Sequence, residues 1–255
     1  MSETTHTPAI ELRDVSLAYE ASIRVLRDID LTVNEGEFVS IVGPSGCGKS
    51  SLLKLISGLV APNQGDVRVR GTKVEGTPAS IGFMFQRDAL LPWASVKDNI
   101  RVGLECARVP RAEHDARIQH LLGLLGLAEF GAHYPHALSG GMRQRTALGR
   151  LLAYAPEIYL MDEPFGALDA LTKITMGREL LRIWSEQKHP VLFVTHDIEE
   201  AVSLSDRVVV MSGRPGTIKA DHAVALPRPR DPRKVRTQPA FHALVDEIWS
   251  DIAEE

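Results

Sequence analysis

The sequence is poor in the residues that mark several common classes of protein. Only two of its 255 residues are cysteines, Cys47 and Cys106, and they form no CxxC pair. This scarcity argues against a disulfide framework or a cysteine-based zinc site and fits a reducing compartment. No apolar run approaches the roughly 20 residues that a membrane helix requires. Any membrane role must therefore depend on partner subunits.

The sequence also has no excess of positively charged residues. Lys and Arg number 29 and Asp and Glu number 33, which gives a net charge of −4 at pH 7. Nucleic-acid-binding proteins carry an overall basic footprint, so we expect no nucleic-acid partner. The first ten residues show no basic segment followed by an apolar one, so we expect no secretion signal. The 44% of apolar residues suffices for a core in one large domain, alone or with a helical insertion.

Short apolar runs predict the buried strands of a parallel sheet. They are rich in Val, Ile and Phe and too short for typical buried helices. Two earlier segments alternate more and predict an antiparallel β edge. The parallel strands are expected at 37–43, 158–162, 191–196 and 207–211, and the antiparallel edge at 10–19 and 27–33.

Helical spacing of leucine and isoleucine appears at 49–59, at 115–127 and after Gly140. Because strand signals are few between 88 and 150, we expect a helical subdomain inserted in the α/β core there. After Gly213 the chain becomes proline-rich and basic, and we expect a solvated linker that contains Arg228, Arg230, Arg233, Lys234 and Arg236. A last helix should pack on its own domain through a stripe of Phe241, Leu244, Val245, Ile248, Trp249 and Ile252.

The stretch GPSGCGKS at 43–50 matches the phosphate-loop pattern GxxxxGKS between a predicted strand and a predicted helix. Its glycines let backbone N–H groups turn toward phosphate oxygens, and the helix N-terminus adds a favourable dipole. Lys49 should reach the β and γ phosphates, and Ser50 should hold Mg²⁺. The predicted nucleotide-binding residues here are Gly43, Pro44, Ser45, Gly46, Cys47, Gly48, Lys49, Ser50 and Ser51.

Two further predicted strands end in candidate catalytic side chains. IYLMDEP (158–164) ends in Asp162, placed to hold Mg²⁺, and Glu163, placed to polarise an attacking water. LFVTHD (192–197) presents His196 at a strand end, where such sheets form their ligand crevice. Position alone leaves His196 open between a functional and a structural role.

A second glycine-rich stretch, LSGGMRQR at 138–145, requires a separate explanation. One nucleotide needs only one phosphate loop. On its own, Ser-Gly-Gly is also compatible with an ordinary helix-capping turn.

Together, GPSGCGKS, Gln86, LSGGMRQR, IYLMDEP, GALD and VTHD, in this order, resemble the ATP-binding subunit of an ABC transporter over roughly residues 10–215. The finer pattern at 86–100 and 162–172 resembles the nitrate/sulfonate/taurine group of bacterial importers. The resemblance implies an α/β P-loop NTPase (RecA-like) fold with a mixed-sheet core, an antiparallel β subdomain and an inserted α-helical subdomain. It implies an ATPase domain over 8–240, with helical residues 88–150, and a C-terminal extension over 213–255 bearing an amphipathic helix.

The resemblance also implies roles for single residues. Tyr19 would stack on adenine, although a core strand aromatic is the alternative. Gln86 would sense Mg²⁺ and the attacking water and relay to the membrane subunits. His196 would contact the γ-phosphate, and Asp169 of GALD would cross to the active site of a partner.

In this family the stretch LSGGMRQR serves the ATP held by a second subunit. Ser139 and the backbone N–H groups of Gly140 and Gly141 would face that γ-phosphate, so two chains would pair head to tail around two ATP molecules. Met142 departs from the commonest family pattern, which has glutamine there. A thioether cannot replace the hydrogen bonds of an amide, so a polar contact by Met142 is in doubt.

The function implied is ATP-driven import of a small anion or organic acid such as nitrate, a sulfonate or taurine. The implied cofactors are ATP and Mg²⁺. The implied partners are two permease subunits and a periplasmic solute-binding protein, with this chain at the cytoplasmic face of the bacterial inner membrane. Residues 90–93 are equally compatible with core packing and with docking of a permease helix. The alternative is a non-transport ABC ATPase acting on nucleic acid or ribosomes, which the single motif set and the net charge of −4 disfavour.

Overall fold

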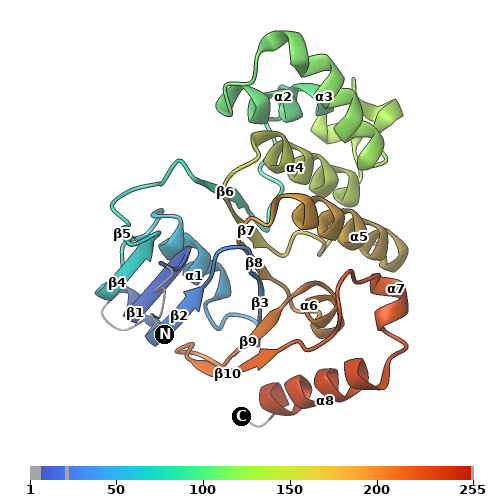
Figure 1. Cartoon of the computed structure of the whole chain (residues 1–255). Helices are drawn as coiled ribbons and strands as arrows, with labels where there is room; N and C mark the ends of the chain where they lie inside the picture. The colour runs from blue at the N-terminus through green and yellow to red at the C-terminus, as the bar shows by residue number, and fades with distance from the viewer. Residues whose placement is uncertain (1–6, 21–22, 254–255) are drawn as a thin grey trace, which may run out of the picture.

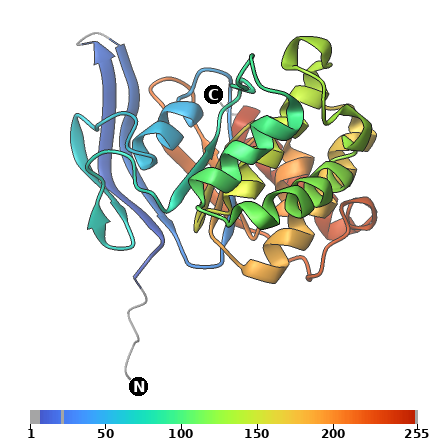
Figure 2. The same cartoon turned by 90° about the horizontal axis from the view of Figure 1, so that it is seen from above.

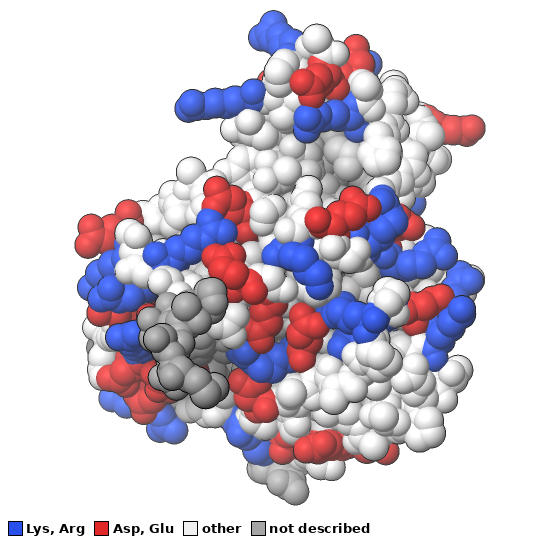
Figure 3. Space-filling view, in the orientation of Figure 1, with Lys and Arg blue, Asp and Glu red and all other residues white. Residues whose placement is uncertain are grey.

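A computed structural model of the protein describes residues 7–20 and 23–253 (Figure 1). Residues 1–6, where we expected no secretion signal, lie outside the described residues. Charges of both signs are interspersed on the face shown in Figure 3. Within the described residues, no helix combines the length and apolar character needed to cross a membrane.

A six-stranded sheet forms the centre of the fold, in the order β10-β9-β3-β8-β7-β6. All its neighbouring strands are parallel except β10, which pairs antiparallel with β9. Every residue of β3, β7 and β8 is buried, which explains the continuous apolar runs and confirms the predicted parallel strands. The strands are β3 (Phe38–Val42), β6 (Ile81–Met84), β7 (Ile158–Asp162), β8 (Val191–Val194), β9 (Arg207–Met211) and β10 (Ile218–Ala223).

A second sheet, four-stranded and antiparallel, has the order β2-β1-β4-β5. The predicted antiparallel edge is confirmed, and helix α1 (Lys49–Ile56) lies between the two sheets (Figure 2). Side chains from both sheets and from α1 share one apolar cluster, so the phosphate-loop helix is fixed on two sides. The strands are β1 (Ile10–Glu20), β2 (Ile23–Val33), β4 (Gln64–Val69) and β5 (Thr72–Lys73).

The stretch predicted as a helical insertion forms a group of helices at the top of Figure 1. Serine side chains cap two of them: Ser95 accepts a hydrogen bond from Asp98 N, and Ser139 accepts one from Met142 N. A Cβ at Gly103 would lie 2.3 Å from Arg150 O, so α2 and α4 pack backbone to backbone there. The helices are α2 (Val96–Cys106), α3 (Arg111–Leu124), η1 (Ala128–Phe130), η2 (Pro135–Ala137) and α4 (Gly140–Tyr154).

Four more helices cover the other face of the six-stranded sheet, together with the helical group. Their apolar residues pack on the side of the sheet that α1 leaves free. The helices are α5 (Ala170–Gln187), α6 (Ile198–Leu204), α7 (Pro232–Val235) and α8 (Pro239–Ala253).

The prediction of a solvated basic linker is wrong for two of its arginines. Arg230 is only 8% exposed, and its guanidinium donates to the carbonyl oxygens of Val224 (2.9 Å) and Leu226 (2.9 Å). Arg228 donates to Asp206 Oδ1 (2.6 Å) and lies over the Trp184 ring. Both arginines therefore fasten the C-terminal segment to the core.

The apolar stripe of α8 packs on its own chain as expected, with one exception. Phe241, Val245 and Ile248 are buried in a cluster with α6 and β9, and Leu244 and Ile252 pack against it. Trp249 is 57% exposed, so the prediction is wrong for this residue. More than half of this residue is therefore in contact with solvent and not with the core.

Candidate functional site

The predicted phosphate loop joins β3 to α1 at the carboxyl edge of the parallel strands. Gly43 adopts φ 150°, and a Cβ there would lie 2.6 Å from Met211 O. Gly48, directly before α1, adopts φ 110° in the left-handed region. The loop can follow this path only because both positions are glycine.

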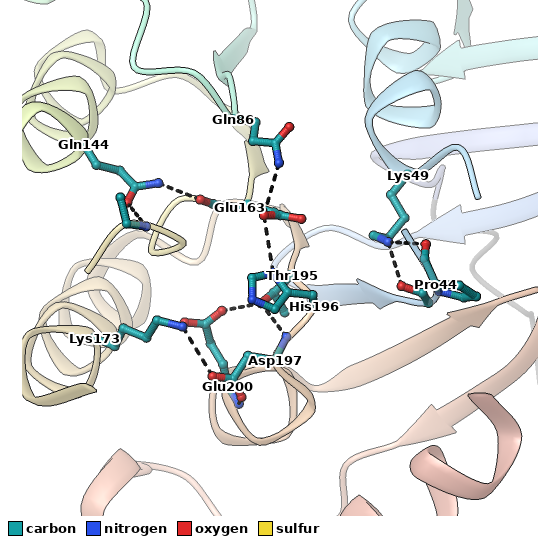
Figure 4. Close-up of polar contacts among 12 residues, drawn as sticks. Pro44, Lys49, Gln86, Gln144, Glu163, Lys173, Thr195, His196, Asp197 and Glu200 are labelled. Atoms are coloured by element: carbon teal, nitrogen blue, oxygen red, sulfur yellow. Dashed lines mark hydrogen bonds and ion pairs between the residues drawn. The ribbon is translucent and has the colours of Figure 1, made fainter. Parts of the chain in front are cut away.

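Lys49 begins α1 and returns its side chain to the loop. Its Nζ donates hydrogen bonds to Gly43 O (2.7 Å) and Pro44 O (2.9 Å), as Figure 4 shows. Only 7% of the residue is exposed. A buried ammonium and a turned-in backbone make this loop suited to an anion.

A pocket of about 350 Å³ opens beside the loop. It brings together residues that are far apart in the sequence: Tyr19, Gln86 and Glu163 join the phosphate loop around one space. An apolar wall from β2 and one unpredicted arginine complete it. The lining residues are Tyr19, Ile23, Val25, Ser45, Gly46, Gly48, Lys49, Ser50, Ser51, Gln86, Glu163 and Arg214.

Several predicted site residues do not line this pocket. Cys47, within the loop, is only 1% exposed and belongs to the apolar cluster as a small core residue. Asp162 is buried at the end of β7. His196 does not line the pocket, but it contacts Glu163, which does. Two more predicted residues, Gly43 and Pro44, belong to the loop but do not line the pocket. The remaining ones lie elsewhere on the molecule: Ser139, Gly140, Gly141 and Asp169.

Tyr19 lies at the surface and not in the core. It is 53% exposed, and its hydroxyl lies 3.2 Å from Ser51 Oγ. The core alternative for this residue is therefore wrong. An exposed aromatic face beside the phosphate loop suits stacking with a base.

Asp162 and Ser50 present oxygen atoms of the kind that Mg²⁺ prefers. Asp162 is 4% exposed, and its Oδ1 is buried with no hydrogen-bond partner among the described residues. Burial raises the pKa of this carboxyl group, and the Ser50 hydroxyl opposes that rise. A buried carboxylate oxygen without a partner fits a cation at this position, so the residues present match the predicted Mg²⁺ site.

Glu163, Gln86 and His196 form one polar cluster (Figure 4). Gln86 Nε2 donates to Glu163 Oε2 at 3.2 Å, and His196 Nδ1 lies 3.3 Å from the same oxygen. The three side chains come from the segments that follow β6, β7 and β8, which are neighbours in the sheet. An oriented carboxylate at the pocket wall can accept a proton from a water molecule.

The segment that carries His196 is fixed by its own network. Thr195 Oγ1 donates to Glu200 Oε2, and Asp197 N donates to Thr195 Oγ1 at 3.0 Å. Asp197 caps α6 by accepting from Glu200 N (3.1 Å) and pairs with Lys173 on α5 (3.5 Å). Burial raises the pKa of Glu200 to about 7.

The LSGGM stretch lies at the start of α4, away from the pocket of its own chain. Ser139 is exposed and caps the helix through Met142 N (3.2 Å). A Cβ at Gly141 would lie 3.1 Å from Leu168 Cδ2. Met142 is half-buried against the core of the helical group. Its thioether packs, and only its backbone makes the polar contact.

Sequence reasoning missed two residues that the structure places in or beside the site. Gln144 joins α4 to Glu163 O (2.7 Å) and Ala167 N (2.8 Å), and its place inside LSGGMRQR was the available signal. Arg214 lines the pocket from the turn between β9 and β10. Nothing in its local sequence distinguishes it from a surface arginine.

A larger pocket of about 540 Å³ lies between β6, α2 and α4. Its wall includes Phe85, Asp88 and Leu91 on both sides of Gln86, and the exposed cysteine Cys106. The four residues 90–93 divide between the two interpretations: Leu90 is 9% exposed and belongs to the core, whereas Trp93 is 74% exposed.

A phosphate loop that shares a sheet edge with the carboxylates of a buried Asp162 and a partly exposed Glu163 is the arrangement of the P-loop nucleotide-binding proteins. The family model described as ABC transporter matches residues 26–166. The chain is 42% identical over 250 residues to the nitrate import ATP-binding protein NrtD of Synechocystis sp. (96% of this chain, 94% of NrtD). It is 48% identical over 209 residues to the aliphatic sulfonates import ATP-binding protein SsuB 1 of Xanthomonas axonopodis pv. citri (82% and 83%).

The solved dimeric structure of MJ0796, a bacterial ABC transporter cassette, superposes on this chain with a TM-score of 0.77. The two are 31% identical, and the match covers 85% of this chain and 99% of that one. The chain therefore belongs to the ATP-binding subunits of ABC transporters and has their fold. It is an ATPase of the kind coupled to transport.

Proposed function

We propose that this chain is the ATP-hydrolysing subunit of a bacterial importer. It works at the cytoplasmic face of the inner membrane with two permease subunits and a periplasmic solute-binding protein. The cargo is a small anion or organic acid of the nitrate, sulfonate or taurine kind. The named functions of the nitrate and sulfonate import relatives support this assignment.

ATP occupies the pocket of about 350 Å³. The triphosphate lies on the phosphate loop against Lys49, and the base lies against Tyr19 and the apolar wall of β2. Arg214 contributes a cation at the base end, because its turn is bonded to the same strand: Gly216 N donates to Val25 O at 2.9 Å.

Two chains pair head to tail around two ATP molecules. The observation that carries this proposal is a separation within one chain. Lys49 and Glu163 line the pocket, whereas Ser139 and Asp169 lie outside it and so are free to serve the pocket of a partner. Exposed Ser139 and the following N–H groups can then face the γ-phosphate held by the partner. The dimeric cassette MJ0796 supports the same assembly.

Hydrolysis uses the polar cluster beside the phosphate loop. Ser50, Asp162 and Gln86 would hold Mg²⁺, which would neutralise charge on the phosphates. Glu163 accepts the proton of the attacking water, and Gln86 orients its carboxylate. His196 supports Glu163 from the opposite side and contacts the γ-phosphate.

The pocket of about 540 Å³ receives an apolar helix of a permease subunit. It is lined on one side by Phe85 and Leu91, which flank Gln86 in the sequence. A permease segment bound there contacts the loop that carries Gln86, and Gln86 bonds Glu163. Permease docking and ATP hydrolysis are therefore linked through neighbouring residues. Trp93, two residues after Leu91 and exposed, offers the permease a further apolar contact.

Uptake measurements test the proposal as a whole. Cells that lack this subunit receive the wild-type chain or Lys49→Ala, and uptake of nitrate, an alkanesulfonate and taurine is compared. Restoration of energy-dependent uptake of one solute by the wild type alone supports the importer. Identical uptake of all three solutes in both strains contradicts it.

A further inference from the structure

Both ends of the Gln144 side-chain amide are committed to hydrogen bonds. Gln144 is 5% exposed; its Nε2 donates to Glu163 O at 2.7 Å, and its Oε1 accepts from Ala167 N at 2.8 Å. Figure 4 shows the side chain reaching from α4 to the segment after β7. Because a glutamine amide has one acceptor and one donor group, this geometry ties α4 to two points of that segment at once.

The first of these points is the main chain of the proposed general base. Glu163 has φ 48°, in the left-handed region that residues with a Cβ rarely adopt. Its neighbours hold it there: Glu163 N donates to Val194 O (2.9 Å), and Gly166 N donates to Glu163 O (3.1 Å). Gln144 adds the second donor to that carbonyl oxygen, so the stretch of main chain from which the Glu163 side chain projects is tied to α4.

The second point belongs to GALD. Ala167 precedes Leu168 and Asp169, and Asp169 caps α5 by accepting from Thr172 N at 3.0 Å. The start of α4 touches the same loop, since a Cβ at Gly141 would lie 3.2 Å from Ala167 O. Helix α4, Glu163 and the GALD loop therefore form one connected unit with Gln144 at its centre.

We infer that Gln144 is a positioning residue that couples the two ATP sites of the dimer. This rests on the proposed head-to-tail assembly. In that assembly Ser139 and Gly141 of one chain contact the ATP of the partner, whereas Glu163 acts on the ATP of its own chain. Engagement of the partner's ATP shifts the start of α4, and Gln144 transmits that shift to Glu163 O and to the GALD loop.

Two substitutions separate this role from plain stabilisation. Gln144→Leu removes both hydrogen bonds at similar volume. Gln144→Glu keeps an acceptor for Ala167 N but sets an oxygen against Glu163 O, and it serves where the leucine variant does not fold. Thr146→Val is the matched control, because Thr146 is buried in the same helix and, among the described residues, its hydroxyl bonds only within α4, to Met142 O at 2.8 Å.

The readout is the ATP dependence of hydrolysis by the full chain. A two-site dimer gives a Hill coefficient approaching about 2 in the wild type and in Thr146→Val. Both Gln144 variants should give a coefficient near about 1, with turnover reduced about tenfold and nucleotide affinity of the monomer unchanged. A wild-type coefficient in both Gln144 variants, or an equal loss in Thr146→Val, overturns the inference.

A second measurement distinguishes a wrong role for Gln144 from a wrong assignment of the dimer. Glu163→Gln alone should form an ATP-dependent dimer in light scattering. A dimer combined with an unchanged Hill coefficient in the Gln144 variants contradicts only the role of Gln144. Absence of that dimer contradicts the head-to-tail assembly and the coupling together.

Discussion

Gln86 Nε2 donates a hydrogen bond of 3.2 Å to Oε2 of Glu163, across 77 positions of sequence. The same carboxylate oxygen lies 3.3 Å from His196 Nδ1. Two neighbours that converge on one oxygen orient the carboxylate and leave it at the wall of the pocket. This arrangement makes Glu163 the residue whose chemistry is most directly testable.

Glu163→Gln should keep ATP binding and lose hydrolysis. Glutamine has the same shape but cannot accept the proton, so turnover should fall about 100-fold or more. Phosphate release measures turnover, and light scattering measures the ATP-bound dimer that should accumulate. The control is Glu105→Gln, an exposed carboxylate outside both pockets. Turnover of Glu163→Gln at the wild-type rate would falsify the base assignment.

The sequence predicted the centre of the site because its residues sit at strand ends. The phosphate loop, Asp162 and Glu163 follow buried apolar strands, and parallel strands present their carboxyl ends at one edge. Local pattern was therefore enough to group them. The roles of these residues remain predictions until the variants are measured.

Features that depend on distant partners could not be predicted in the same way. Gln144 bonds residues 19 and 23 positions away; its place inside LSGGMRQR marks the residue, but the local sequence does not identify these partners. Arg230 looked like a linker cation, but the carbonyl oxygens it meets belong to α6 and to the residues that directly follow α6 and β10. Strand β6 was missed because IGFM is short and its Gly82 lowers strand propensity.

Ser139→Ala should spare nucleotide binding by the monomer and cost turnover. Its hydroxyl is proposed to face the partner's γ-phosphate, and loss of one such hydrogen bond to a charged group should lower turnover about tenfold or more. The substitution also removes a helix cap. Ser95→Ala is the matched control, because Ser95 caps α2 in the same way and lies outside the proposed interface.

Fluorescent-nucleotide titration and phosphate release distinguish the outcomes for Ser139. A turnover loss confined to Ser139→Ala supports contact with the partner's ATP. Equal losses in the two serine variants mean that capping alone explains the effect. A sharp fall in the ATP affinity of the monomer contradicts the assignment across the dimer.

Arg214→Ala should weaken ATP binding without affecting the triphosphate contacts. The turn that carries Arg214 pairs with β2, which supplies Ile23 and Val25 to the base end of the pocket. A guanidinium beside a base contributes modestly, so ATP affinity should fall about threefold to tenfold. Affinity for inorganic tripolyphosphate should stay unchanged. Competition titrations with both ligands measure the difference.

Two control variants show how the Arg214 measurement should be interpreted. Arg24→Ala removes an exposed arginine that lies between Ile23 and Val25 but outside the pocket lining, so it should change neither affinity. Lys49→Ala should weaken both ligands, since its ammonium lies at the loop. If Arg214→Ala weakens tripolyphosphate as much as ATP, the arginine binds phosphate instead of the base.

Glu200→Gln should remove a pH dependence of stability. The folded pKa is raised from 4.5 to about 7, so the folded chain keeps a proton that the unfolded chain releases between these values. Stability is therefore fully present below pH 4.5, falls as pH rises toward 7 and then levels off. The lost stability at pH 8 is about 3 kcal/mol, and neutral glutamine should recover it.

Urea unfolding at pH 4.5 and pH 8 measures this effect. Glu199→Gln is the matched control, because Glu199 precedes Glu200 on α6 but is half-exposed and pairs with Arg236 at 3.1 Å. Its unfolding should keep the wild-type pH dependence. The same pH dependence in Glu200→Gln and the wild type contradicts the assignment of the proton to Glu200.

Attachment of a bulky maleimide to Cys106 should block activation by the permease and leave basal hydrolysis intact. Cys106 is exposed and lines the pocket of about 540 Å³, whereas Cys47, within the phosphate loop, is 1% exposed. The reagent therefore modifies the pocket selectively, and Cys106→Ser, which gives the reagent no thiol there, is the control. ATPase activity is measured with and without the permease subunits in vesicles. The pocket wall continues through Phe85 to Gln86, so a blocked pocket should remove only the stimulation of hydrolysis by the permease. Unchanged stimulation after complete labelling of Cys106 would place permease docking on another surface.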